Sequence, residues 1–146
     1  MEDISRLNKN CFACGKTNPI GPKLEFSINS ENQVETFFTP PKEWSGWGEI
    51  VHGGLQTVIL DEISAWAIVL LIKKFTLTIN ARVEFLRPLY VDEQLKATAE
   101  IEKIEDDIIY VSSVILNERK KICTKGRFIF KVVSKEKLVS LALKEQ

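Results

Sequence analysis

The sequence predicts an α+β fold in which one curved antiparallel β-sheet wraps around a single long central α-helix. Residues 53–72 are apolar on nearly all sides, which is typical of a helix surrounded by other structure. Two short segments of alternating polarity precede this helix, and four more follow it. Strands grouped on either side of one helix lack the strand–helix alternation of parallel units, so they favour an antiparallel sheet.

The two segments before the helix predict a hairpin. Apolar and polar residues alternate over 24–28 and again over 34–38, and residues 29–32 between them are typical turn formers. Two prolines at 40–41 end the second strand. A loop rich in glycine and tryptophan over 44–48 then leads to the helix.

The four segments after the helix predict strands over 77–85, 95–101, 109–116 and 122–133. Short polar stretches join them, as expected for antiparallel neighbours. A short amphipathic segment over 135–143 closes the chain.

Length and composition indicate one folded domain, which we place at 23–146, behind an N-terminal extension over 1–22. The 146 residues contain no linker-like stretch and no internal repeat. Lysine plus arginine and aspartate plus glutamate both number 20, so no basic excess indicates binding to nucleic acid or to an anionic membrane. Residues 1–6 lack the apolar core of a signal peptide, and the longest apolar run is about half of the ~20 residues that a membrane span requires. We therefore expect a cytoplasmic protein.

The chain has three cysteines, and this odd number argues against a secreted disulfide framework. Cys11 and Cys14 have the spacing of a zinc knuckle or a redox pair. A tetrahedral structural site usually takes a second ligand pair, and only Cys123 and His52 remain as donors of the usual kind. We therefore expect no metal and no cofactor, and interpret the two thiols as packed within a turn.

The residues that indicate chemistry open the long helix. His52, Gly53 and Gly54 stand at its start, and Asp61 follows about two turns later on the stripe of Gly54. The first N–H groups of a helix lack intrahelical acceptors, and glycine lets a ligand approach them, so Gly53 and Gly54 can polarise a carbonyl. Asp61 can then activate water as a general base or attack as a nucleophile. The alternative is a structural aspartate held by hydrogen bonds.

The chain resembles the hotdog-fold acyl-CoA thioesterases of the PaaI-like type. The resemblance covers about residues 23–133 and rests on the order of the elements and on three motifs: Val51-His52-Gly53-Gly54, Leu60-Asp61 and Val83-Glu84-Phe85-Leu86-Arg87-Pro88. It implies a hotdog fold and hydrolysis of an acyl thioester to a free acid and coenzyme A. It also implies that Asp61 is catalytic and that Thr78, ten residues before Pro88, helps to position water.

Thr78 and Gly46 qualify this resemblance. Strict alternation along the strand places Thr78 on one face with Asn80, Arg82 and Glu84, opposite the apolar residues. Some relatives carry an asparagine that helps to bind the thioester oxygen six residues before the motif histidine, where this chain has Gly46. The oxyanion site would then rest on backbone donors alone.

Three further residues are candidates for substrate binding: His52, Glu62 and Trp47. His52 is expected mainly to tie the loop to the sheet through a ring hydrogen bond. Glu62 points about 100° away from Asp61 and is expected to meet a partner subunit or the loop, or to tune Asp61. Trp47 lies in the loop before the motif, where it would line an acyl channel or pack under the loop.

The resemblance also implies assembly as a homodimer or as a homotetramer built from two dimers, with the glycine donors of one chain facing the aspartate of the other. An open six-stranded sheet has edges that a second copy would cover. The partner expected is acyl-CoA or another acyl thioester. Two other functions stay open: a non-catalytic acyl-CoA-binding or scaffolding protein, and a dehydratase in which His52 is the acid–base residue.

Overall fold

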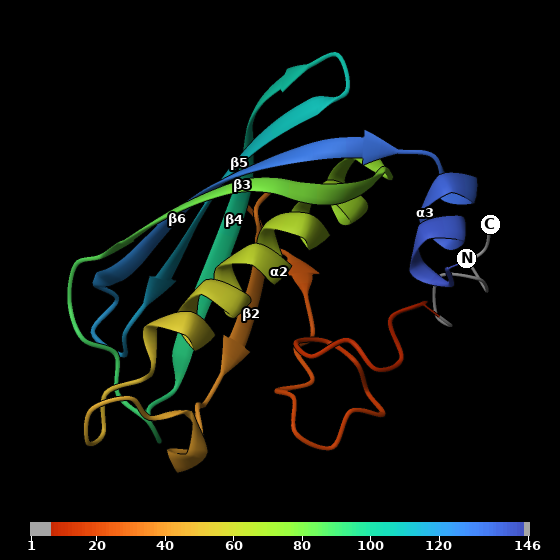
Figure 1. Cartoon of the computed structure of the whole chain (residues 1–146). Coiled ribbons are helices and arrows are strands. Elements are labelled where there is room, and N and C mark those ends of the chain that lie inside the picture. Colours follow the sequence, from red (N-terminus) through yellow and green to blue (C-terminus); the bar gives the residue numbers. More distant parts are fainter. Residues whose placement is uncertain (1–6, 145–146) are drawn as a thin grey trace.

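The computed structural model describes residues 7–144 and has the hotdog fold predicted from the sequence (Figure 1). Six strands form one sheet in the order β1-β2-β4-β5-β6-β3, and every neighbouring pair is antiparallel. The strands are β1 (Ser27–Ile28), β2 (Val34–Phe38), β3 (Phe75–Phe85), β4 (Leu95–Glu105), β5 (Ile108–Leu116) and β6 (Ile122–Val133). The other elements are a 3-10 turn (Lys42–Trp44), the central helix α2 (Gly53–Ile72) and α3 (Lys135–Ala142).

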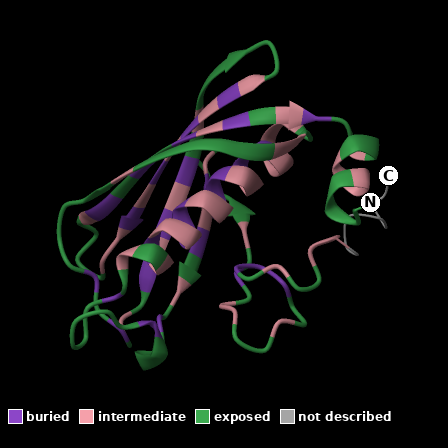
Figure 2. Ribbon diagram, viewed as in Figure 1, coloured by how far each residue is buried: buried purple, intermediate pink, exposed green. Residues whose placement is uncertain are grey.

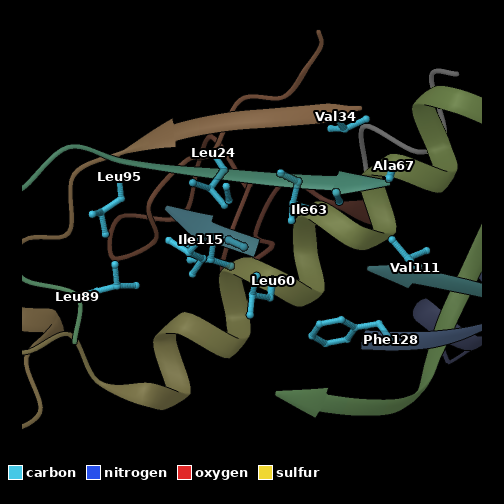
Figure 3. Close-up of a cluster of buried hydrophobic side chains, with 14 of the residues drawn as sticks. Leu24, Val34, Leu60, Ile63, Ala67, Leu89, Leu95, Val111, Ile115 and Phe128 are labelled. Atoms are coloured by element: carbon cyan, nitrogen blue, oxygen red, sulfur yellow. The ribbon is translucent and has the colours of Figure 1, made fainter. Parts of the chain in front are cut away.

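Helix α2 lies across the concave face of the sheet, and the core fills the space between them (Figures 1 and 3). Ile59, Leu60, Ile63, Ala67 and Ile68 of the helix are almost fully buried. Alternate residues of β4, β5 and β6 meet them from the sheet, including the stacked rings of Phe128 and Phe130. Helix α2 is long and apolar enough to cross a membrane. Here the sheet covers one side of the helix, and 39% of its most apolar stretch is buried inside the protein (Figure 2).

The edge strand β3 contains a β-bulge that overturns the predicted alternation. Thr78 pairs with Phe130 and Asn80 with Ile129, so Ile79 is the extra residue and is 54% exposed. Paired residues on antiparallel strands point to the same face. Thr78 therefore faces α2 together with Ala81, on the side of the buried Phe128 and Phe130. The expectation that Thr78 shares a face with Asn80, Arg82 and Glu84 is wrong, because the bulge reverses the alternation after Thr78.

The described part of the N-terminal extension, residues 7–22, is a series of turns beside α2 (Figure 1). Ala13 is 2% exposed and belongs to the core, and its carbonyl accepts a hydrogen bond from the Leu24 N–H at 2.9 Å. The extension is thus packed on the domain. Residues 1–6, in which we expect no signal segment, lie outside the described residues.

Candidate active site

The start of α2 is capped by His52, an exposed residue with extended backbone geometry. Its Nδ1 accepts a hydrogen bond from the Gly54 N–H at 2.9 Å. The expected hydrogen bond from the ring to the sheet is replaced by this cap of the helix. The Gly54 N–H, one of the two predicted carbonyl donors, is occupied by this ring. No hydrogen bond in the described part of the chain uses the Gly53 N–H, which points out of the first turn as the sequence predicts.

Gln56 anchors the same turn from inside the core. It is 5% exposed, and its Nε2 donates to the Val51 carbonyl at 2.9 Å while its Oε1 accepts from the Thr124 hydroxyl at 2.5 Å. A buried amide with both ends satisfied fixes the backbone on which it sits. Gln56 thus holds the helix start against β6. Sequence reasoning missed this role, although a glutamine within an apolar helix is a signal of a buried polar contact.

Asp61 lies two turns further along α2, half-buried, and pairs with Thr78 across the edge of the sheet. The Thr78 hydroxyl donates to Asp61 Oδ1 at 2.8 Å. Burial raises the pKa of Asp61 above its ordinary value, the Thr78 hydrogen bond opposes this rise, and repulsion from the Glu62 carboxylate adds to it. A carboxylate with one oxygen held and its proton affinity raised is suited to take a proton from water.

The two predicted halves of the site stand apart within one chain. Seven residues separate Gly54 from Asp61, so the helical rise puts them about 10 Å apart. A thioester carbonyl bound at the glycine N–H groups would be out of reach of Asp61 in the same chain, because general bases act at about 3 Å, or through one water. The structure brings together Asp61 and Thr78 in one place, and His52, Gly53 and Trp47 in another.

The second group lines a hollow of about 530 Å³ in front of the helix start, bordered by Gly46, Trp47, Ile50, Val51, His52 and Gly53. Trp47 is 88% exposed, so it packs against little of its own chain. A Cβ placed on Gly46 would lie 3.4 Å from the His52 Cα, an ordinary contact, so a larger residue fits there.

Glu62 turns away from this hollow toward the N-terminal extension. Its Oε1 accepts from the Trp66 Nε1 at 3.1 Å and from the Cys11 thiol at 3.3 Å. Burial raises the pKa of Glu62 to about 6. The N-terminal extension is thus the segment that Glu62 meets. Sequence reasoning did not pair it with Cys11, which lies 51 residues away.

Comparison with known proteins agrees with this architecture. A family model described as the thioesterase superfamily matches residues 48–124, just over half of the chain, including α2 and Asp61. The chain belongs to the thioesterase superfamily. No curated protein sequence matches it.

Solved structures of other thioesterase superfamily proteins share the fold. A thioesterase from Haemophilus influenzae is 19% identical with a TM-score of 0.74, over 91% of this chain and 90% of its own. A hypothetical thioesterase protein from Streptococcus pneumoniae, crystallised with coenzyme A, is 17% identical with a TM-score of 0.69, over 76% of this chain and 89% of its own. The protein RHA08564 is 21% identical with a TM-score of 0.76; the match covers 81% of this chain but only 61% of that protein.

Proposed function

We propose that the protein is an acyl-CoA thioesterase that hydrolyses an acyl-CoA and water to a free carboxylic acid and coenzyme A. Membership of the thioesterase superfamily and the coenzyme A complex of the pneumococcal neighbour support the substrate class. The observation that carries the proposal is the half-buried Asp61 held by Thr78 at 2.8 Å.

In this proposal Asp61 is the general base. Its free carboxylate oxygen takes a proton from water as the water oxygen attacks the thioester carbon, while Thr78 holds the other oxygen in place. The carbon–sulfur bond then breaks and coenzyme A leaves as a thiolate, which recovers a proton. The alternative, attack by Asp61 on the carbonyl through a transient anhydride, uses the same position of the carboxylate.

The negative charge that develops on the carbonyl oxygen needs donors fixed in advance. The Gly53 N–H at the positive end of α2 meets this need, and the Gly54 N–H becomes a second donor if the exposed His52 ring turns away. His52 and Trp47 border the hollow in front of these groups and would contact the acyl group or the carrier.

We also propose that the active site forms between two copies of the chain. The separation of about 10 Å between the glycine N–H groups and Asp61 along one helix supports it, because a second chain can bring its own glycines to Asp61. Strand β3 supports it too: among the described residues 7–144 it pairs with β6 alone, and Leu77, Ile79 and Phe85 on it are 41–55% exposed. An edge of this length and apolarity is suited to pairing with another copy.

The experiment that tests this function is thiol release from a panel of short, long and aromatic acyl-CoAs by the wild type and by Asp61→Asn. We expect the variant to lose about 10²- to 10⁴-fold in kcat, the usual contribution of a general base, with an unchanged circular dichroism spectrum. Asp106→Asn, at an exposed aspartate in the β4–β5 turn, is the matched control and should keep wild-type activity. Undiminished hydrolysis in Asp61→Asn would contradict the mechanism.

A second candidate is a non-catalytic acyl-CoA-binding protein. Two features favour this candidate because each weakens the oxyanion site. Position 46 is a glycine and offers no side-chain donor. The Gly54 N–H is already occupied by the His52 ring. Binding of acyl-CoA, measured by calorimetry, without thiol release from any member of the panel would establish this function in place of hydrolysis.

A further inference from the structure

The N-terminal extension brings two thiols to the carboxylate of Glu62. Cys14 is buried, Cys11 and Glu62 are half-buried, and one ligand atom from each lies within 4.8 Å of the other two. Cys11 and Cys14 come from a turn of the extension and Glu62 from the middle of α2. All three cysteines of the chain are free thiols. The proposed hydrolysis does not use this cluster.

The spacing of the cluster suits one tetrahedral ion. Zinc binds thiolate sulfur at about 2.3 Å and carboxylate oxygen at about 2.1 Å, which places neighbouring sulfur and oxygen ligands about 3.6 Å apart and two sulfurs about 3.8 Å apart in a tetrahedron. Cys11 Sγ and Glu62 Oε1 are 3.3 Å apart, held by a hydrogen bond from the thiol. Replacing that proton by an ion requires little movement of either residue.

The turn that carries the two cysteines is built tightly around the sulfur of Cys11. The Cys14 N–H donates to Cys11 Sγ at 3.5 Å, and the Gly15 N–H donates to the Cys11 carbonyl at 3.0 Å. A Cβ on Gly15 would lie only 2.5 Å from the Lys9 carbonyl oxygen, so no other residue fits without moving the backbone. A backbone N–H directed at a sulfur stabilises its thiolate form, which is the form that binds metal.

Charge and access around the cluster also suit a bound cation. Two thiolates and one carboxylate with a divalent ion carry a net charge of −1. Cys14 borders a hollow of about 880 Å³ that Lys9, Lys16 and Lys73 also line, so positive side chains lie on that side of the site and suit its negative charge. The same hollow provides a path from solvent for the ion and for a fourth ligand.

We propose that Cys11, Cys14 and Glu62 bind one zinc ion, with the fourth position open to this hollow. Thiolate ligands select zinc over magnesium or calcium, and three protein ligands with an open position are an established zinc arrangement. The sequence predicted no metal because no second ligand pair is visible in it. The third ligand comes from α2 and is apparent only in the fold.

The ion would fasten the extension to the residue next to Asp61. Without it, the two cysteines of the extension contact Glu62 only through the weak hydrogen bonding of thiols, that of Cys11 at 3.3 Å. With it, three coordinate bonds join the turn to α2, so zinc binding is expected to order the extension. This inference is independent of the proposed hydrolysis.

The test uses the full chain, purified without metal under reducing conditions. Zinc is titrated against a chromophoric chelator and counted by mass spectrometry, and cobalt(II) is added in parallel to detect thiolate coordination by its charge-transfer absorption. We expect one equivalent of zinc per chain, and a loss of affinity of about tenfold or more in Cys11→Ser, Cys14→Ser and Glu62→Gln. Cys123→Ala removes the thiol in β6, away from the cluster, and should bind zinc as the wild type does.

Hydrogen exchange keeps the test decisive if a cysteine variant folds poorly. In the wild type, added zinc should slow the exchange of amides in residues 11–24 and leave those of β5 unchanged. Zinc affinity in Glu62→Gln equal to that of the wild type would overturn the three-ligand site. Failure of the wild type to bind zinc, with Cys11 and Cys14 forming a disulfide under mild oxidation, would identify a redox pair in place of a metal site.

Discussion

At the residue scale, the two largest influences on the pKa of Asp61 oppose each other. Burial raises it and the hydrogen bond from Thr78 lowers it. Thr78→Val keeps the shape of the side chain but removes the donor, so the pKa of Asp61 should rise further. The proposed base works only when deprotonated, and activity is therefore lost as the pH falls through this pKa. We expect the acid limb of kcat/KM to move to higher pH in Thr78→Val, as measured over pH 4 to 9.

Thr76→Val is the control for this variant. Thr76 lies two residues before Thr78 on the same face of β3 and makes no hydrogen bond with Asp61. The acid limb of kcat/KM in Thr76→Val should coincide with that of the wild type. An acid limb at the wild-type pH in Thr78→Val would show that the Thr78 hydroxyl does not act on the group that titrates.

Gly46 offers a second prediction at the residue scale. The position accepts a Cβ at ordinary contact distance from His52, so Gly46→Asn should fold without strain and place an amide beside the hollow. An added donor near the developing oxyanion should raise kcat several-fold, short of the about 10²-fold that a fully aligned donor contributes. Gly46→Leu fills similar space without a donor and should not raise kcat. Equal rates in the two variants would contradict a role for the amide.

At the scale of the element, the first turn of helix α2 is capped by the side chain of His52. His52→Ala removes the acceptor of the Gly54 N–H and should lower the free energy of unfolding by about 1 kcal/mol, measured by urea denaturation. His52→Asn provides another capping acceptor and should restore most of that stability. If both variants unfold at the wild-type urea concentration, the hydrogen bond does not stabilise the helix.

The strands after the helix were predictable from the sequence because each has a long alternating pattern, and α2 was predictable because its apolar run is long. The strand predicted over 24–28 is shorter, Ser27–Ile28. The predicted bounds of α2, 53–72, are confirmed, and β6 matches its predicted range of 122–133. The bulge in β3 was not predictable, since Ile79 is apolar and continues the alternation as an ordinary strand residue would. The contact of Cys11 with Glu62 was hidden for another reason: no periodic signal links residues 51 positions apart.

At the scale of the whole molecule, the proposal that the active site spans two chains of a dimer can be tested by mixing two inactive variants. A chain with Gly53→Val places a branched side chain at the open donor of the hollow and should lose the oxyanion site, and a chain with Asp61→Asn should lose the base, so neither should work alone. After unfolding and refolding together, half of the dimers would contain one of each, and each of these would have one intact site. The mixture should regain about a quarter of wild-type activity if the site spans two chains. No recovery, with mixed dimers verified by mass spectrometry, would place the site within one chain.

The bulge at Ile79 also affects how sequences in this superfamily should be compared. A bulge is one extra residue in one strand, and Ile79 follows Thr78, so a relative without the bulge has one residue fewer between the position of Thr78 and the end of β3. An ungapped alignment anchored on the end of β3 would then match the hydroxyl to a residue on the opposite face of the sheet. The residue equivalent to Thr78 is found as the partner of the residue equivalent to Phe130 in β6, because the bulge leaves that pairing intact.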